Sequence, residues 1–342
     1  MSVVIPCYNY GRYLAQCVET VLMQEDVKVE VVIVDDASPD GSAAVAREIA
    51  AAEPRVRVIE NVVNQGHIAT YNIGLAQVTG DYVVLLSADD LLAPGCLRRA
   101  TALLEAHPEV AFTYGFVPDF TDQPPAAETR VRSWTIWPGH EWLEKVTRRG
   151  HNVISCPEVV MRANVLRDLG GYDGRLPHSA DFYLWMLAAT RGAVGRVNGP
   201  DQAYYRVHGN NMHLQQFAGV FTDLIERRRT FDLLFTEHHG RLPNLTELRT
   251  RVRHALAKDA LNLACRAFDR NGADRDAKLA DLMEFAAATD PQVIGSGLWR
   301  ACERRRIRYD NGQGPAIVHR VSAVVDDIRG RIRWRRWRRR GV

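Results

Sequence analysis

The segment Tyr82-Val83-Val84-Leu85-Leu86-Ser87-Ala88-Asp89-Asp90 joins a run of apolar residues to two adjacent carboxylates. A short apolar run bounded by polar residues is typical of a strand buried on both faces, as in a parallel sheet. The carboxylates stand where this strand ends, and open α/β sheets bind ligands at the carboxyl ends of their strands. The segment therefore predicts an α/β fold with a ligand site at Asp89 and Asp90.

A second acidic pair, Asp35-Asp36, follows another apolar run, Val31-Val32-Ile33-Val34. Adjacent carboxylates repel each other, so keeping them together favours a cation, a hydrogen-bond donor or a substrate hydroxyl against them. A single pair could equally belong to a turn or a helix cap, because Asp is a favoured N-cap residue. Two pairs after neighbouring strands favour a ligand site.

The N-terminal part of the chain alternates short β-rich runs with helical patterns, which is typical of a mainly parallel sheet flanked by helices. The β-rich runs predict strands at residues 2–6, 31–35, 56–60, 82–87 and 111–116. Apolar residues at helical spacing, together with helix-start signals, predict helices at residues 14–22, 41–52 and 94–106. No Gly-x-Gly-x-x-Gly motif follows the first strand, which counts against a dinucleotide-binding dehydrogenase.

The composition is typical of a soluble globular protein. The 342 residues, 46% of them hydrophobic and 25% charged, suffice for one large or two modest domains. No apolar stretch approaches the roughly 20 residues of a membrane-spanning helix, and no basic-then-apolar leader precedes the first strand. The six cysteines are scattered without a Cys-x-x-Cys pair, so the sequence predicts neither a zinc site nor a disulfide framework. We therefore expect a cytoplasmic protein.

The second half of the chain differs in kind from the first. An irregular, Pro-containing stretch at 118–140 predicts a mobile loop. Beyond it we expect strands at 158–162 and 203–207, a helix at 181–191, and then helices at 219–236, 246–270 and 276–288.

The charge changes along the chain as well. Residues 1–205 carry 17 Lys and Arg against 25 Asp and Glu, whereas residues 206–342 carry 27 against 16. We expect two domains, 1–212 and 213–342, with a boundary near 210–218.

Five motifs occur along residues 2–210, and together they resemble the family 2 glycosyltransferases with the GT-A fold. The motifs are Val4-Ile5-Pro6-Cys7-Tyr8-Asn9, Val34-Asp35-Asp36-Ala37-Ser38-Pro39-Asp40-Gly41-Ser42, Asn64-Gln65-Gly66 with Asn72 and Gly74, Gly80-Asp81-Tyr82 leading to Ser87-Ala88-Asp89-Asp90, and Gly170-Gly171-Tyr172-Asp173. The resemblance implies a GT-A-like, mainly parallel sheet flanked by helices, followed by a helical C-terminal part. It also implies transfer of a sugar from a nucleotide-sugar donor to the hydroxyl of a carbohydrate or lipid-linked acceptor.

The resemblance further implies a divalent metal, Mg²⁺ or Mn²⁺, on the donor diphosphate. Breaking the anomeric bond builds negative charge on the nucleoside diphosphate, and a cation held by one or two carboxylates supplies the counter-charge. In the family, a D-x-D element at this strand end binds the metal and the ribose, and here Ser87 replaces its first Asp. We expect Asp89, the first choice, and Asp90 to bind the metal, and Ser87 and Asp89 to contact the donor.

The residues Pro6, Tyr8 and Asn9, with the pair Asp35 and Asp36, resemble the family's nucleotide pocket. There a carboxylate accepts a hydrogen bond from the base, and an aromatic ring can lie against the base. A uracil-type base has one ring N–H to donate, so an Asp acceptor favours a UDP-sugar. The alternative for Tyr8 is an ordinary core aromatic residue.

Two further segments resemble family elements less specifically. Asn64 and Gly66 resemble a backbone turn close to the donor, although a plain loop would have the same sequence. The segment Tyr205-Arg206-Val207-His208-Gly209-Asn210-Asn211 resembles an element at the end of the domain. There a neutral imidazole, His208, could complete the metal sphere and Arg206 could face a phosphate. The alternative is that His208 is a structural residue.

The helix expected after Ala180 resembles the family's Glu-Asp element beside the acceptor. Inversion at the anomeric carbon needs a base that takes the acceptor's proton as its oxygen attacks. Asp181 occupies the matching position and is the candidate catalytic base, whereas Ala180 replaces the preceding Glu. The alternative is that Asp181 only caps the helix. No Gln-x-x-Arg-Trp element follows, so the chain resembles a single-addition transferase rather than a processive synthase.

The C-terminal tail is strongly basic, because residues 329–340 contain eight Arg together with Trp334 and Trp337. The preceding apolar residues that share one helical face are Val321, Val324, Val325, Ile328 and Ile332. This composition is typical of a segment on an anionic membrane surface, so we expect a protein peripheral on the inner face of the membrane. The alternatives are a disordered basic tail and a nucleic-acid contact. The acidic N-terminal part disfavours nucleic acid.

Two other functions stay open. A sugar nucleotidyltransferase shares a similar sheet, but it normally carries a Gly-rich basic phosphate loop after the first strand, and this sequence has none there. A non-catalytic sugar- or nucleotide-binding relative is suggested by Ser87 and Ala180. Donor hydrolysis measured with and without metal distinguishes that binding protein from an active transferase.

Overall fold

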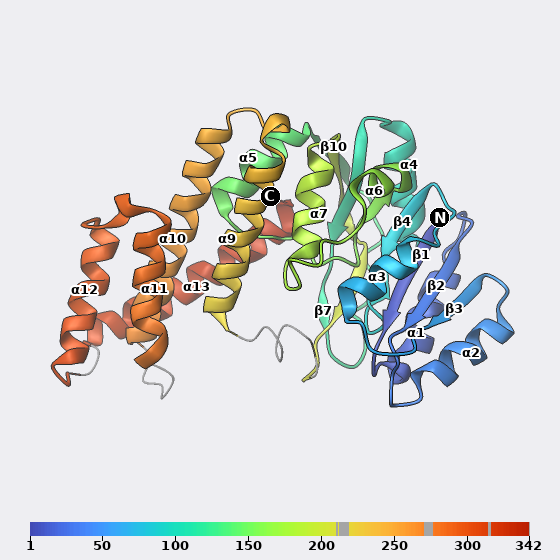
Figure 1. Cartoon of the computed structure of the whole chain (residues 1–342), viewed down its shortest axis with the longest axis horizontal. Helices are drawn as coiled ribbons and strands as arrows, with labels where there is room; N and C mark the ends of the chain where they lie inside the picture. Colours follow the sequence, from blue (N-terminus) through green and yellow to red (C-terminus); the bar gives the residue numbers. More distant parts are fainter. Residues whose placement is uncertain (210, 212–218, 270–275, 314–315, 342) are drawn as a thin grey trace. The chain divides into compact units, whose positions relative to one another are not determined.

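The computed structural model describes residues 1–209, 211, 219–269, 276–313 and 316–341 (Figure 1). They form two compact units. The first unit comprises the described residues of Met1–Leu143 and Asn152–Asn211, together with Gly341. The second comprises Glu144–His151 and the described residues of Met212–Arg340. The boundary expected at 210–218 falls on residues of which only Asn211 is described.

The first unit is built on an eight-stranded sheet with the strand order β3-β2-β1-β4-β9-β6-β10-β8 (Figure 1). The strands are β1 (Ser2–Cys7), β2 (Glu30–Asp35), β3 (Val56–Glu60), β4 (Tyr82–Leu85), β6 (Val110–Phe116), β8 (Ser133–Trp137), β9 (Val160–Arg162) and β10 (Ala193–Asp201). Neighbours among β3, β2, β1 and β4 run parallel, as do β6 and β10. By contrast, β9 is antiparallel to β4 and β6, and β8 is antiparallel to β10.

Helices cover both faces of this sheet (Figure 1). They are α1 (Gly11–Leu22), α2 (Ser42–Ala52), α3 (His67–Leu75), α4 (Cys96–Ala106), α5 (Gly139–Arg149), α6 (Ala163–Leu169) and α7 (Ala180–Ala189). Alternate residues of β1 point to opposite faces, so Val3 and Ile5 pack with α1, α2 and α4 in the main core. Val4 faces α3, where a side chain larger than hydrogen at Gly74 would collide with Val4. The apolar strands are therefore buried on both sides, and the predicted mainly parallel α/β fold is confirmed.

A second, three-stranded sheet with the order β5-β11-β7 lies beyond the end of β4. Its strands are β5 (Leu91–Leu92), β7 (Asp119–Phe120) and β11 (Ala203–Arg206). Leu91 and Leu92 pair antiparallel with Tyr204 and Ala203. Because β5 follows Asp89 and Asp90 directly, this pairing brings the segment after β11 to the acidic pair.

The second unit is helical. Its elements besides the end of α5 are α9 (Val220–Glu237), η1 (His239–Arg241), α10 (Leu245–Asp269), α11 (Asp276–Thr289), η2 (Pro291–Val293), α12 (Gly297–Asp310) and α13 (Ile317–Arg340). The buried residues of α10 include five that recur four positions apart, as expected for a helix that packs along one face: Leu248, Val252, Leu256, Ala260 and Ala264. Among the residues that the structure describes, no helix combines the length and apolarity needed to cross a membrane.

The structure differs from the sequence-based prediction where strands carry weak patterns. The sequence predicts a loop at 118–140, whereas β7 and β8 form there and β8 is the edge of the main sheet. Edge strands are exposed on one side and need no continuous apolar run, and Trp134 is 39% exposed. The sequence also does not predict β10. Its Gly195 packs closely against Leu103 of α4, and a glycine within a strand weakens the sequence pattern by which the strand could be predicted.

Candidate active site

The strand ends β1, β2 and β4 meet at one edge of the main sheet, because Cys7 pairs with Asp35 and Val4 pairs with Leu85. The residues that follow these strands, including Asn9, Asp36 and Asp89, therefore gather at the same edge. This is the position at which parallel sheets bind ligands.

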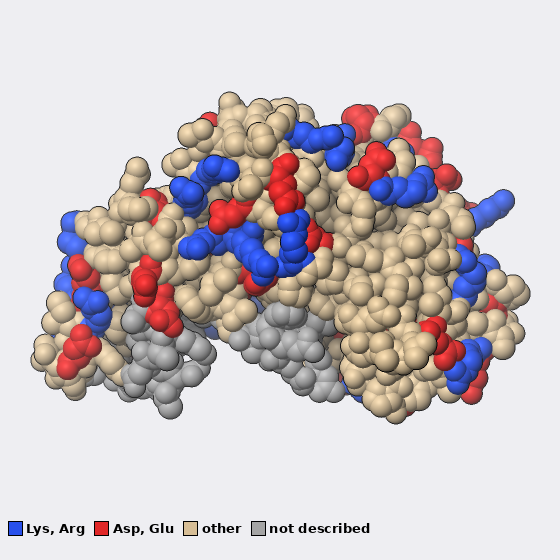
Figure 2. All heavy atoms as spheres, viewed as in Figure 1, with Lys and Arg blue, Asp and Glu red and all other residues tan. Residues whose placement is uncertain are grey.

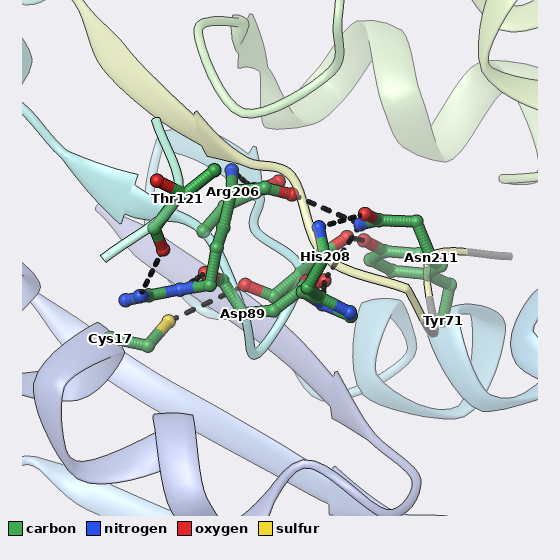
Figure 3. Close-up of polar contacts among 9 residues, drawn as sticks. Cys17, Tyr71, Asp89, Thr121, Arg206, His208 and Asn211 are labelled. Atoms are coloured by element: carbon green, nitrogen blue, oxygen red, sulfur yellow. Dashed lines mark hydrogen bonds and ion pairs between the residues drawn. The ribbon is translucent and has the colours of Figure 1, made fainter. Parts of the chain in front are cut away.

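Asp89 contacts the segment that follows β11 (Figure 3). Its Oδ2 atom lies 3.0 Å from Nε2 of His208, and both side chains are largely buried. The amide Nδ2 of Asn211 lies 3.5 Å from the same oxygen and donates at 3.0 Å to the carbonyl of Arg206. A carboxylate oxygen and an imidazole nitrogen are thus placed side by side, as two ligands of one cation would be.

The imidazole of His208 is fixed in place by aromatic rings. The ring of Tyr13 stacks on it with a centroid separation of 5.2 Å and an interplanar angle of 29°. Tyr10 meets it edge to face at 5.5 Å. The backbone N–H of His208 donates to Oδ1 of Asn211 at 2.6 Å. These contacts orient the ring toward Asp89.

Asp90 makes a different contact from its neighbour. Its Oδ1 accepts a hydrogen bond of 2.9 Å from the backbone N–H of Arg206. Burial, reinforced by the adjacent carboxylate of Asp89, raises the pKa of Asp90 well above its usual range. In the described part of the chain, no group of three or more His, Cys, Asp or Glu side chains is placed to hold a metal ion. The structure therefore brings Asp89 and His208 together, and Asp90 anchors β11.

The guanidinium of Arg206 is committed to protein groups. It donates to the carbonyl of Asp89 at 2.8 Å, to Gln16 at 2.6 Å and to the carbonyl of Thr121 at 3.3 Å. Its guanidinium carbon also lies 4.6 Å and 4.4 Å from the ring centroids of Tyr13 and Phe120. Arg206 is 4% exposed and holds the turn at Asp89, rather than facing outward as a phosphate contact would.

Two buried oxygens at the ends of β1 and β2 have no hydrogen-bond partner among the described residues, namely Oδ1 of Asp35 and Oδ1 of Asn9. The other carboxylate oxygen of Asp35 accepts from the backbone N–H of Ser38 at 3.0 Å. Asn9 has a φ of 60°, in the left-handed region, and its N–H donates to the Ser38 hydroxyl at 3.1 Å. Leaving buried acceptors unpaired costs free energy, so these atoms indicate a ligand with N–H or O–H donors.

Asp36 holds the loop between β3 and α3. Its carboxylate accepts hydrogen bonds from the Asn61 side chain at 2.7 Å and from the backbone N–H groups of Gln65 and Gly66 at 2.8 and 2.9 Å. Asn64 accepts from the same Gly66 N–H at 3.2 Å. Gly66 has a φ of 85°, which explains the glycine at this turn. Asp36 thus acts on the loop, while its neighbour Asp35 keeps a carboxylate oxygen unpaired.

The other expected donor residues lie near the same strand ends. Pro6 is within β1 and pairs with Val34 of β2. Tyr8 is 44% exposed, which excludes the alternative of a core aromatic residue. The hydroxyl of Ser87 lies 3.3 Å from that of Tyr71 on α3.

Asp181 lies in the first turn of α7 and is half-buried. Its Oδ1 accepts from the backbone N–H of Phe182 at 2.6 Å, and its Oδ2 lies 3.4 Å from the amide of Asn152. Burial raises the pKa of Asp181 to about 6, and the N–H of Phe182 and the nearby His178 lower it in part. A carboxylate that titrates near pH 6 can take a proton efficiently near neutral pH.

Several residues of this site have no signal of their own in the sequence. Tyr13 and Asn152 act only through contacts with residues distant in the chain. Asn211 belongs to the segment that resembles the end of the family domain, and its place beside Asp89 depends on the pairing of β5 with β11.

Comparisons with known proteins show which family the chain is similar to. The sequence model described as Glycosyl transferase family 2 matches residues 2–170. The putative glycosyltransferase EpsE of Bacillus subtilis is 32% identical over 203 residues, which cover 57% of this chain and 68% of that protein. An uncharacterized glycosyltransferase of Haemophilus influenzae is 24% identical over 219 residues, covering 61% and 66%. The matches thus span about two thirds of the length of these relatives.

Solved structures resemble the chain over most of its length. Staphylococcus aureus TarS 1–349 in complex with UDP-GlcNAc has a TM-score of 0.65 at 14% identity, covering 91% of this chain and 92% of that one. The mannosyltransferase PcManGT of Pyrobaculum calidifontis, in complex with GDP-Man and Mn²⁺, has a TM-score of 0.53 at 20% identity, covering 90% and 86%. At these identities the similarity shows the fold, which is that of the GT-A glycosyltransferases.

Proposed function

The chain belongs to glycosyltransferase family 2, and from this premise we propose that it moves a sugar from a UDP-sugar to an acceptor hydroxyl with inversion at the anomeric carbon. The observation that carries the proposal is the pair of unpaired buried oxygens on Asp35, at the end of β2, and Asn9, just after β1. Of these two strands, β1 is the neighbour of β4, the strand that leads to Asp89. One part of this edge offers acceptors to a base, and another offers ligands to a diphosphate-bound cation.

The unpaired oxygen of Asp35 supports a uracil base on the donor. Uracil has a single ring N–H, which can donate to this buried carboxylate oxygen. The exposed ring of Tyr8 is available to lie against the base, with Pro6 and Asn9 on the same strand end. The loop with Asn64 and Gly66, which Asp36 holds, borders the donor in this arrangement.

The residues at the diphosphate end fit a divalent cation. A carboxylate oxygen of Asp89 and an imidazole nitrogen of His208 lie 3.0 Å apart, a separation that two ligands of one ion can have. Mg²⁺ and Mn²⁺ are commonly held by few protein groups together with substrate phosphates. When bound, such an ion neutralises the charge that develops on the departing diphosphate. Asp90 accepts a hydrogen bond from the backbone N–H of Arg206 and so helps to hold the turn at Asp89, the first ligand.

The proposed base is Asp181. With its pKa near 6, the carboxylate is mostly ionised at pH 7 and still basic enough to accept the proton of an acceptor hydroxyl. Asn152, 3.4 Å from its Oδ2, orients the carboxylate. Membership of family 2 favours a glycosyltransferase over a sugar nucleotidyltransferase.

We propose a separate role for each of the two parts of the chain. Residues 1–212 form the catalytic domain, and residues 213–342 approach a carbohydrate or lipid-linked acceptor. We propose a cytoplasmic protein that transfers one sugar at a time and associates with the inner face of the membrane through its basic tail. The support is the composition of α13, which carries eight Arg at residues 329–340.

A panel of nucleotide sugars tests the donor assignment. Melting temperature and donor hydrolysis are measured with UDP-, GDP- and CDP-sugars, each with Mn²⁺ and with a chelator. We expect UDP-sugars to stabilise the protein most, and only in the presence of metal. A preference for GDP-sugars, or equal stabilisation in the chelator, would contradict the proposal.

A further inference from the structure

The C-terminal helix α13 presents four arginines on one of its faces. Arg329, Arg333, Arg336 and Arg340 follow one another at intervals of four, three and four residues, which places them along one side of a helix. They line a hollow of about 530 Å³ together with Ile332 and Trp337. The hollow therefore combines four cations with two apolar side chains.

Among the described residues, three arginines of this face lack the acidic partners that Arg227 of α9 and Arg251 of α10 have. Arg227 pairs with two aspartates and Arg251 with two glutamates. Figure 2 shows basic and acidic side chains next to one another on the face in view. By contrast, Arg333, Arg336 and Arg340 make no ion pair within the described ranges of the chain. Like charges three and four residues apart destabilise a helix, so this arrangement favours a bound anion.

Trp337 forms a fixed wall of the hollow. The guanidinium carbons of Arg149 and Arg333 lie 5.3 and 5.5 Å from the centroid of its indole ring. Two cations on one ring restrict its rotation and keep Arg333 beside the hollow.

An apolar strip continues from the hollow toward the start of the helix. Ile332 is 61% exposed, Ile328 is 52% exposed and Val325 is 37% exposed. At spacings of three and four residues they extend the same side of the helix that carries the arginines. Exposed aliphatic side chains in line with arginines match a ligand that has both an anionic group and a hydrocarbon chain.

We propose that this hollow binds a phosphorylated amphiphile, with a phosphate or diphosphate group on Arg333, Arg336 and Arg340 and a hydrocarbon chain along Ile332 and Ile328. The planar guanidinium donates two parallel hydrogen bonds to phosphate oxygens, which suits it to this group. Inorganic phosphate would leave the apolar strip exposed, and a nucleic acid would need no strip of aliphatic side chains. The inference deepens the proposed membrane association and does not depend on the transfer chemistry.

The test uses the full chain in the presence of a chelator, because both probes would bind free Mn²⁺ and the proposed donor site binds diphosphates only through the cation. Farnesyl diphosphate, kept below its critical micelle concentration, and inorganic diphosphate are titrated by calorimetry. We expect farnesyl diphosphate to bind at least tenfold more tightly. The double variant Arg333→Gln with Arg336→Gln should lose at least tenfold in that affinity. The matched control, Arg335→Gln with Arg339→Gln, removes two arginines of the same helix that do not line the hollow and should stay within twofold.

A third variant separates the two halves of the site. Ile332→Ser should weaken farnesyl diphosphate severalfold and leave inorganic diphosphate unchanged. Equal losses in the two arginine pairs would reduce the site to general positive charge and overturn the proposal. So would equal affinity for the two probes, or displacement of farnesyl diphosphate by a single-stranded oligonucleotide at lower concentration. Donor hydrolysis, measured with Mn²⁺ on the same protein preparations, reports on the proposed transferase separately.

Discussion

The imidazole Nε2 of His208 lies 3.0 Å from the carboxylate Oδ2 of Asp89, although 119 positions separate the two residues in the sequence. The contact is made by the small sheet, in which β11 pairs with β5 directly after the acidic pair. This pairing places the segment that follows β11, which carries His208 and Asn211 and is called the strap below, at the end of β4. The first two predictions concern this contact.

Replacing Asp89 by Ala should abolish metal-dependent donor binding, because its carboxylate is the best-placed anionic ligand for a diphosphate-bound cation. The affinity for UDP is measured by calorimetry with Mn²⁺ and with a chelator. Asp122→Ala, which removes an exposed carboxylate of the same unit, is the control and should bind as the wild type does. A folded Asp89→Ala protein with unchanged metal-dependent affinity would remove this residue from the metal site.

Tyr13 is expected to matter through its ring and not its hydroxyl, since the ring stacks on His208. Tyr13→Leu should weaken Mn²⁺-dependent UDP binding by about 10-fold or more, the usual effect of losing a group that orients a metal ligand. Tyr13→Phe keeps the stacking and should bind within about twofold of the wild type. If Phe and Leu weaken binding equally, the stacking does not position the imidazole.

Asp35→Asn should change which base is bound. If the amide oxygen keeps the bond to Ser38, the amide N–H₂ faces the base and opposes the ring N–H of uracil. We expect UDP affinity to fall about tenfold or more, because an unpaired buried group costs about 1–3 kcal/mol. Cytosine offers an acceptor at the same ring position, so CDP should lose less. Parallel losses for both nucleotides would show that Asp35 does not read the base.

Asp181→Asn should retain donor affinity and lose transfer by about 10²–10⁴-fold, because the amide cannot accept a proton. In the wild type the transfer rate should rise with pH through about 6, the pKa to which burial raises Asp181, and level off above it. The variant should lack this acid limb. Transfer within a few-fold of the wild type would place the base elsewhere.

The same substitution should stabilise the protein at neutral pH. Between its ordinary pKa of 3.8 and the raised value of about 6, folded Asp181 keeps a proton that the unfolded chain has lost. Its ionisation therefore lowers the free energy of unfolding as pH rises through this window. The melting temperature of Asp181→Asn should exceed that of the wild type by more at pH 7.5 than at pH 4.5. An equal difference at both pH values would contradict burial of the charge.

The parts of the fold that could be predicted from sequence are those in which burial leaves a simple pattern. The runs at 31–35 and 82–87 are apolar throughout because both faces of a central parallel strand are covered. The edge strand β8 is half exposed and β10 carries Gly195 for contact with α4, so neither has such a pattern.

The candidate site divides in the same way. The sequence singles out Asp89 and Asp181 because each follows a recognisable motif, but it does not say that Asp90 turns to the backbone of Arg206. The stacking of Tyr13 on His208 is also absent from any local pattern, because it depends on how a distant strand pairs. Local sequence thus indicates which side chains are reactive, and tertiary pairing decides which of them meet.

The strap after β11 also sets how this protein can be cut and recombined. A chain that ended at Arg206 would retain every strand of both sheets and yet lack His208 and Asn211. Exchange of C-terminal helices between relatives should therefore join the chains after Asn211, and a circular permutation that opened the chain at Val207 would detach the imidazole from its sheet. The residues that the proposed site needs therefore extend a few positions beyond the last strand of the fold.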